Sequence, residues 1–60
     1  MPVVQVQMWE GRTEEQIKEI IKGITDVFVN QGSKPGSVRV LIQEYPKDRW
    51  GVGGKPASES

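Results

Sequence analysis

Residues 13–32 read TEEQIKEIIKGITDVFVNQG, and this segment predicts one amphipathic helix. Thr13 and Gln16 have the spacing of a capping box, and the acidic residues between them suit the positive end of the helix dipole. Gly32 is typical of the position just beyond the last turn. We therefore predict a helix over 14–31. One apolar stripe recurs along it with helical spacing: Ile17, Ile20, Ile21, Ile24, Val27 and Phe28.

Two segments rich in β-branched residues flank this helix. Residues 2–8 and 38–43 both alternate between faces, which predicts two strands with one apolar face each. A strand, a helix and a second strand predict a right-handed β-α-β unit with parallel strands, in the α+β class and in one domain over 1–60. Beyond it we expect a loop at 45–48, a short glycine-rich hairpin at 50–54 and a flexible tail at 55–60.

The composition of these 60 residues excludes several kinds of chemistry. The chain has no Cys and no His, so thiol nucleophiles, zinc–thiolate sites and Ser-His-Asp catalysis are excluded. Eight basic and eight acidic residues cancel, which gives no support to a nucleic-acid partner. No signal peptide or membrane-spanning run is visible, so we expect a cytoplasmic protein without a membrane partner.

The size of the chain points to self-association. A single helix covers only one face of a two-stranded sheet and leaves the other face and both edges open. A chain of this length without disulfides has a small core for its entropy cost, and oligomerisation is a common remedy. We therefore predict a homo-oligomer.

Three residues are candidates for catalysis. Pro2 would become a secondary amine if Met1 were removed, and burial or nearby cations would favour the neutral form of that amine. Arg12 follows the first predicted strand, and Arg39 interrupts the apolar second strand. Two arginines suit the recognition of carboxylates through their planar guanidinium groups. By itself each residue also fits an ordinary terminus or a solvated side chain.

Other residues carry weaker signals. Trp9 and Trp50 fit either packing or ligand contact. Glu10 and Glu44 fit surface or capping roles better than the role of a base. The glycine-rich segment at 49–55 lacks the spacing of a phosphate-binding loop and a following helix, which excludes that function.

Taken in order, these features resemble the 4-oxalocrotonate tautomerase family over nearly the whole chain. The resemblance rests on Pro2 at the start of a strand, a capped helix, and three motifs: Glu10-Gly11-Arg12, Ser37-Val38-Arg39-Val40 and Trp50-Gly51-Val52-Gly53-Gly54. It implies a subunit that forms dimers, three of which assemble into a hexamer, and an isomerase that needs no cofactor or metal.

The family resemblance also implies roles for individual residues. Pro2 matches the general base that moves a proton between atoms of a 2-hydroxydienoate, such as 2-hydroxymuconate, or of an enol-pyruvate. Arg12 matches the arginine that binds a distal carboxylate. Arg39 matches the arginine that reaches the 2-oxo end from a neighbouring subunit. Trp50 matches an apolar wall of the pocket, and the implied setting is aromatic hydrocarbon catabolism.

The chain departs from the family pattern in three places. Trp9 replaces an aliphatic residue, which with Trp50 makes the expected pocket narrower or more aromatic. The connection between helix and second strand is about one residue shorter. Val52 stands where dehalogenating relatives carry an acidic residue, which favours isomerisation over hydration.

Two other functions compete with a tautomerase. One is a non-catalytic oligomer of the same fold with its proline blocked, and the mass of the mature chain distinguishes it. The other is nucleic-acid binding through a basic patch that Asp48 interrupts, and zero net charge disfavours it. That patch comprises Lys47, Arg49, Trp50 and Lys55.

Overall fold

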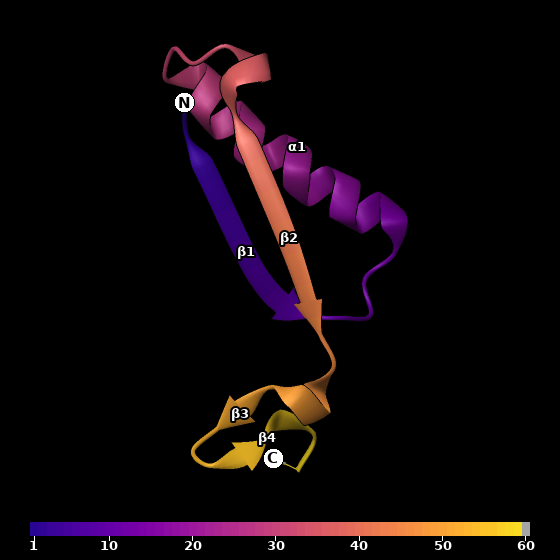
Figure 1. The fold of residues 1–60 in the computed structure, drawn as a ribbon. Coiled ribbons are helices and arrows are strands. Elements are labelled where there is room, and N and C mark those ends of the chain that lie inside the picture. The colour runs from indigo at the N-terminus through magenta and orange to yellow at the C-terminus, as the bar shows by residue number, and fades with distance from the viewer. Residues whose placement is uncertain (60) are drawn as a thin grey trace.

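The computed structural model describes residues 1–59, which form a β-α-β unit followed by a small hairpin (Figure 1). Strands β1 and β2 are parallel neighbours, and β3 and β4 form an antiparallel pair, so the predicted fold class is confirmed. The elements in chain order are β1 (Val3–Trp9), α1 (Glu14–Asn30), β2 (Arg39–Tyr45), β3 (Gly51–Val52) and β4 (Lys55–Pro56), with 3-10 turns at Pro35–Ser37, Lys47–Arg49 and Ala57–Glu59.

Helix α1 begins and ends with hydrogen bonds that its sequence encodes. The Thr13 hydroxyl accepts from the Gln16 amide at 3.2 Å, and the Gln16 side chain accepts from the Thr13 amide at 3.0 Å. At the other end the Ser33 amide donates to the Phe28 carbonyl while Gly32 adopts a φ of 106°, a Schellman motif. The helix therefore starts at the predicted residue and ends one residue earlier than predicted.

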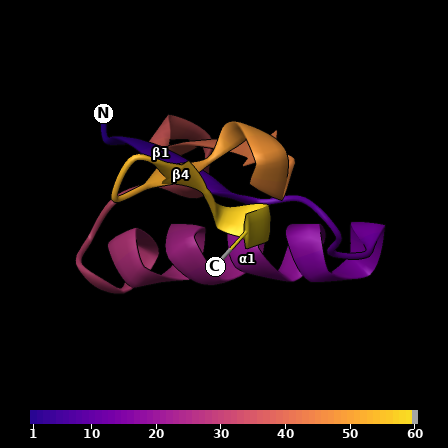
Figure 2. The same ribbon diagram turned by 90° about the horizontal axis from the view of Figure 1, so that it is seen from below.

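The sheet and the helix form two layers, with α1 on one face of the strands only (Figure 2). Alternate side chains of the strands are partly buried against the helix: Val4, Val6, Met8, Val40 and Ile42. Only Val38 and Ala57 among the described residues are almost fully buried. A single chain therefore has a very thin core.

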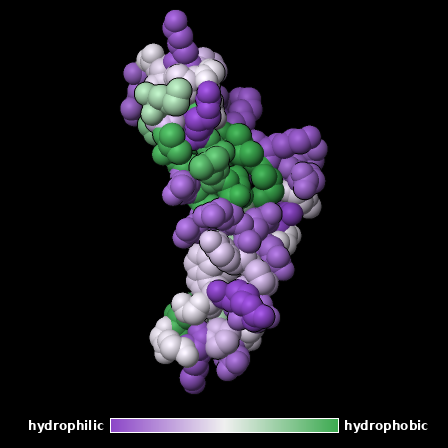
Figure 3. Space-filling view, viewed as in Figure 1, coloured by the Kyte–Doolittle hydropathy of each residue, from purple (hydrophilic) through white to green (hydrophobic). Residues whose placement is uncertain are grey.

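The opposite face of the sheet is open and partly apolar. Val3 and Leu41 on this face remain 57% and 47% exposed. Gln7 and Gln43 are register partners there, and the Gln7 amide donates to Gln43 at 3.2 Å. Figure 3 looks onto the strands and shows apolar atoms gathered over the middle of the β-α-β unit.

The chain is elongated rather than round. The β3–β4 hairpin extends beyond the carboxyl end of β2, away from the β-α-β unit (Figure 1). The principal extents are 43 × 23 × 13 Å and the radius of gyration is 14.4 Å, whereas a compact domain of this length has about 10 Å. This shape leaves much surface available for contact with other copies.

Several predicted boundaries were wrong. Strand β1 occupies 3–9 rather than 2–8, and β2 occupies 39–45 rather than 38–43. Val38 lies outside β2 because its amide donates to the Pro35 carbonyl and caps the preceding 3-10 turn. Tyr45, expected in a loop, ends β2 because it pairs with Trp9 and its carbonyl accepts from the Glu10 amide at 2.9 Å.

The predicted hairpin and tail also needed correction. The hairpin runs to 56 rather than 54, because Gly53 and Gly54 supply the two positive φ angles of its turn and β4 then pairs with β3. Residues 55–59 are therefore structured rather than a loose tail. The Ala57 amide donates to the Trp50 carbonyl at 2.7 Å, which holds the last turn in place. Residue 60 of the predicted tail lies outside the described residues.

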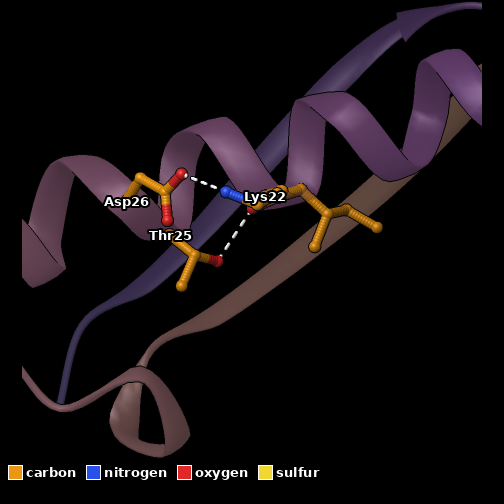
Figure 4. Close-up of polar contacts among 4 residues, drawn as sticks. Lys22, Thr25 and Asp26 are labelled. Carbon is orange, nitrogen blue, oxygen red and sulfur yellow. Dashed lines mark hydrogen bonds and ion pairs between the residues drawn. The ribbon is translucent and has the colours of Figure 1, made fainter.

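The outer side of α1 carries local polar contacts (Figure 4). Lys22 forms an ion pair with Asp26 at 2.7 Å, and the Thr25 hydroxyl donates to the Ile21 carbonyl at 2.8 Å. The hydrogen bond to Asp26 and its charge raise the pKa of Lys22. Within 1–59, α1 and the shorter helical turns lack the length and apolar character needed to span a membrane.

Candidate active site

The predicted site residues divide between the two ends of the sheet. Pro2 and Arg39 lie where the parallel strands begin, and Trp9 and Arg12 lie where β1 ends. The seven residues of β1 separate these groups by roughly 23 Å, at about 3.3 Å per residue. The candidate residues therefore fall into two separate groups within one chain, which we call the amino half-site (Pro2 and Arg39) and the carboxyl half-site (Trp9, Arg12 and Trp50).

The amino half-site is held together through the backbone. The Arg39 amide donates to the Pro2 carbonyl at 3.0 Å, which fixes the two residues beside each other across the strands. Pro2 is half-buried, and the Arg39 side chain is exposed on the open face. Its guanidinium donates to the carbonyl of Gly36 in the preceding 3-10 turn. The guanidinium is therefore held at the turn before β2 on the open face, and its action on a substrate in a neighbouring subunit stays a prediction.

The carboxyl half-site is built on three aromatic rings. Trp50 meets Trp9 edge to face with ring centroids 6.0 Å apart, and meets Tyr45 in the same way at 6.1 Å. Trp9 and Tyr45 are register partners at the ends of the two strands. The Lys47 ammonium lies 4.7 Å from the centroid of the Trp9 ring, a cation–π contact. These contacts tie the segment before β3 to the end of β1.

Arg12 lies on the same end as this aromatic cluster. Its guanidinium donates to the Trp9 carbonyl over 3.4 Å, a long and therefore weak hydrogen bond. The ion pairs among residues 1–59 involve Lys18, Lys22 and Arg49. In this part of the chain Arg12 and Arg39 thus have no carboxylate partner, which leaves both guanidinium groups available to an anionic ligand.

Sequence reasoning missed Tyr45 and Lys47 as members of the carboxyl half-site. Both were assigned to a loop, because Pro46 follows Tyr45 and breaks the strand pattern. The alternation that begins at Arg39 places Tyr45 on the face of Arg39 and Leu41, and this signal was sufficient to find the ring. The contact of Lys47 with Trp9 depends on the 3-10 turn after β2, which no pattern indicated.

The described residues of one chain show neither a metal-binding cluster nor an enclosed pocket. Residues 1–59 contain no cluster of three or more acidic, His or Cys side chains that would suit a metal ion. They also enclose no pocket. Glu10 and Glu44, weighed above as bases, are both exposed. The candidate residues for binding or catalysis are therefore those of the amino and carboxyl half-sites.

Comparison with known proteins identifies relatives over nearly the full length. The family model described as tautomerase enzyme matches residues 2–59. The chain is 43% identical over 60 residues to a 2-hydroxymuconate tautomerase of Pseudomonas sp. (strain CF600), covering 98% of this chain and 95% of the relative.

Solved structures have the same fold. TomN, a 4-oxalocrotonate tautomerase homologue in the tomaymycin biosynthetic pathway, superimposes with a TM-score of 0.89 at 30% identity, over 97% of this chain and 91% of TomN. A heterohexamer 4-oxalocrotonate tautomerase from Chloroflexus aurantiacus J-10-fl gives a TM-score of 0.87 at 32% identity, over 98% of this chain and 97% of its own.

Proposed function

This chain belongs to the tautomerase family and is a 4-oxalocrotonate tautomerase-like isomerase, and from this premise we propose that it uses Pro2 as a general base. The proposed substrates are 2-hydroxydienoates such as 2-hydroxymuconate, or enol-pyruvates, and the reaction needs no cofactor. The observation that carries the proposal is the tautomerase family match over residues 2–59, which begins at Pro2.

The base is the secondary amine that removal of Met1 creates at Pro2. Met1 is 82% exposed, so an aminopeptidase has access to it. Pro2 is half-buried at the start of β1. Burial disfavours the protonated amine, and a cation supplied by a neighbouring subunit would do the same, so both would lower its pKa and make a neutral base available near pH 7. The amine takes the proton of the substrate's 2-hydroxyl group and returns it to a carbon atom of the substrate.

The arginines bind the charged ends of the substrate. The Arg39 guanidinium stabilises the negative charge that develops on the 2-oxygen and its carboxylate. Arg12 binds the distal carboxylate of a dicarboxylate substrate. Trp50 and Trp9 form an apolar wall of the pocket between the two arginines. Because the amino and carboxyl half-sites lie about 23 Å apart in one chain, a second copy must supply the missing half.

The proposed assembly is a homohexamer built from three dimers. The open face of the sheet, the protruding hairpin and the thin core of a single chain all support association. The heterohexamer from Chloroflexus aurantiacus is a relative with six subunits, which supports this number.

The test compares mass-verified protein lacking Met1 with two variants in which the amine is absent or altered. One variant keeps Met1, so that the Pro2 nitrogen is an amide, and the other is Pro2→Ala. Ketonisation of 2-hydroxymuconate, followed by ultraviolet absorbance, should fall by about 100-fold or more in the variant that keeps Met1. Pro2→Ala should also fall, because a primary amine has a different pKa and geometry. Full activity in both variants would exclude Pro2 as the base.

The competing function is a non-catalytic oligomer whose Pro2 nitrogen stays blocked. An intact mass that retains Met1, with no ketonisation by the purified protein, would favour this alternative.

A further inference from the structure

The connection between β1 and α1 is short and is fixed at both of its ends. On one side the Glu10 amide donates to the Tyr45 carbonyl at 2.9 Å, just beyond the last paired residue of β1. On the other side the Thr13 side chain caps α1. Only Gly11 and Arg12 lie between these two anchors, where the chain leaves the sheet and turns back towards the helix (Figure 1).

Gly11 has a backbone conformation that other residues avoid. Its φ is 119°, outside the regions that residues with a Cβ atom adopt readily. Apart from its chain neighbours, no atom of residues 1–59 lies within 4 Å of where a Cβ atom on Gly11 would be, so lack of space does not require the glycine. The requirement is conformational, because the chain must turn sharply between two fixed anchors.

The Arg12 side chain depends on this backbone for its position. The guanidinium donates to the Trp9 carbonyl over 3.4 Å, a long hydrogen bond, and the residue is exposed. Arg12 belongs to none of the ion pairs within residues 1–59. A change of φ at Gly11 redirects the atoms that follow it, and few side-chain contacts would hold the guanidinium in place against that change.

We propose that Gly11 is a positioning residue, whose positive φ directs the Arg12 guanidinium towards the distal carboxylate of the substrate. The inference rests on the proposed function, in which Arg12 binds that carboxylate, and it adds a residue that acts only through Arg12. Such a residue affects the binding of a second carboxylate and leaves the proton transfer at Pro2 unchanged. Its replacement should therefore impair dicarboxylate substrates and spare substrates with a single carboxylate.

Gly32 offers a matched control at the other end of α1. Its φ is 106°, and a Cβ atom there would likewise meet no atom of residues 1–59 within 4 Å beyond its chain neighbours. It belongs to the Schellman motif that ends the helix and lies far from Arg12 in the chain. Gly11→Ala and Gly32→Ala therefore impose a similar backbone strain, and comparing them separates strain from positioning.

The experiment measures two substrates in the wild type and in both variants. 2-Hydroxymuconate has two carboxylates, whereas 2-hydroxy-2,4-pentadienoate lacks the distal one. In Gly11→Ala the ratio of kcat/KM for the dicarboxylate to kcat/KM for the monocarboxylate should fall about three- to tenfold, mainly through KM for 2-hydroxymuconate, because a charge-assisted hydrogen bond is weakened. Gly32→Ala should keep the wild-type ratio, although both variants should lower the urea midpoint. An unchanged ratio in Gly11→Ala, or an equal fall in both variants, would overturn the inference.

A double variant tests whether Gly11 acts through Arg12. Added to Arg12→Gln, Gly11→Ala should lower the ratio no further, and a further fall would overturn the inference. Gly11→Asn is a milder change, because Asn adopts positive φ more readily than Ala, and it decides the matter if Gly11→Ala fails to fold. Its ratio should fall about two- to threefold, and a wild-type ratio in Gly11→Asn would contradict the proposal.

The inference and the proposed function fail in different ways. If Pro2→Ala and the Met1-retaining protein keep full activity, the proposed base is wrong, whatever the glycine variants do. If Arg12→Gln leaves KM for 2-hydroxymuconate unchanged, the role of Arg12 is wrong and the role of Gly11 is wrong with it. If Arg12→Gln raises that KM and Gly11→Ala does not, only the role of Gly11 is wrong.

Discussion

At the amino end of the sheet, Pro2 and Arg39 are joined by a backbone hydrogen bond, and within residues 1–59 the polar contact of the Arg39 side chain is with the Gly36 carbonyl. At the carboxyl end, by contrast, three aromatic rings and Lys47 form a cluster in which side chains hold one another. The amino end therefore has the candidate base and an arginine but few side chains packed around them. The carboxyl end has a packed aromatic cluster with Arg12 beside it.

This difference agrees with the absence of an enclosed pocket within residues 1–59. In the proposed assembly each end supplies what the other lacks, and a dimer with antiparallel placement of its sheets would unite one of each. The same chain would then contribute to two sites. We therefore expect variants at the two ends to differ in their kinetic and stability effects, and variants in helix α1 to affect both ends.

The largest effect after loss of Pro2 is expected from the two arginines, and the comparison predicts different kinetic effects for them. Arg39→Gln should lower kcat about 100-fold or more, because in the proposed mechanism Arg39 stabilises charge that develops in the reaction. Arg12→Gln should raise KM for 2-hydroxymuconate about tenfold with a smaller change in kcat, because a charged hydrogen bond to a remote carboxylate is lost. Steady-state kinetics distinguishes the two.

The matched control is Arg49→Gln. Arg49 is exposed and paired with Asp48, and it belongs to neither half-site, so its kinetic constants should equal those of the wild type. If Arg12→Gln and Arg39→Gln lowered kcat by the same factor, the proposed division of labour between the two ends would be wrong.

A smaller effect, confined to the carboxyl end, is expected from Trp50→Leu. This change removes both edge-to-face contacts of Trp50 and should lower the free energy of unfolding by about 1–3 kcal/mol. Amide hydrogen exchange should accelerate first at Gly51, Val52 and Lys55. Trp50→Phe should restore part of the protection, whereas equal acceleration in the middle of β1 would show that the cluster does not act locally.

Thr13→Ala should affect both ends alike. The Thr13 hydroxyl caps α1, and its loss should lower the free energy of unfolding by about 1 kcal/mol. Urea denaturation at fixed protein concentration measures this, because association shifts the midpoint. Thr13→Ser keeps the cap and should behave as wild type. A change in kcat/KM of folded Thr13→Ala would mean that the helix start influences a half-site directly.

The smallest effect is expected from the exposed pair of Lys22 and Asp26. Asp26 raises the pKa of Lys22, so the pair stabilises the fold while Lys22 is charged, below its ordinary pKa of 10.5. The contribution is lost as the pH rises through the raised value. The difference in melting temperature between wild type and Asp26→Asn should be small at pH 7, reduced by salt and absent at strongly alkaline pH. A difference that persists there would point to another role for Asp26.

Much of the backbone followed from local patterns in the sequence. The capping box at Thr13, the apolar stripe of α1 and the two glycines of the β3–β4 turn encode their structures through neighbouring residues. The predicted tail was wrong because the Ala57 amide bonds to the Trp50 carbonyl, a contact that depends on how the hairpin folds back.

The candidate site was less accessible to sequence reasoning. The sequence named Pro2, Trp9, Arg12, Arg39 and Trp50 as candidates, and their roles stay predictions. Their separation into two ends follows from the parallel register of β1 and β2. The contact of Lys47 with Trp9 arises where the chain turns after β2. Contacts between distant segments decide such features, and no local pattern specifies them.

The most direct test of the two half-sites mixes two variants with different defects. Pro2→Ala and Arg12→Gln chains are unfolded together, refolded together and assayed at low 2-hydroxymuconate concentration, beside each variant refolded alone. If a site combines the two ends of different chains, some mixed interfaces carry an intact Pro2 opposite an intact Arg12. Activity should then rise to about a quarter of wild type for random pairing. Activity no higher than the average of the two variants alone would contradict the shared site.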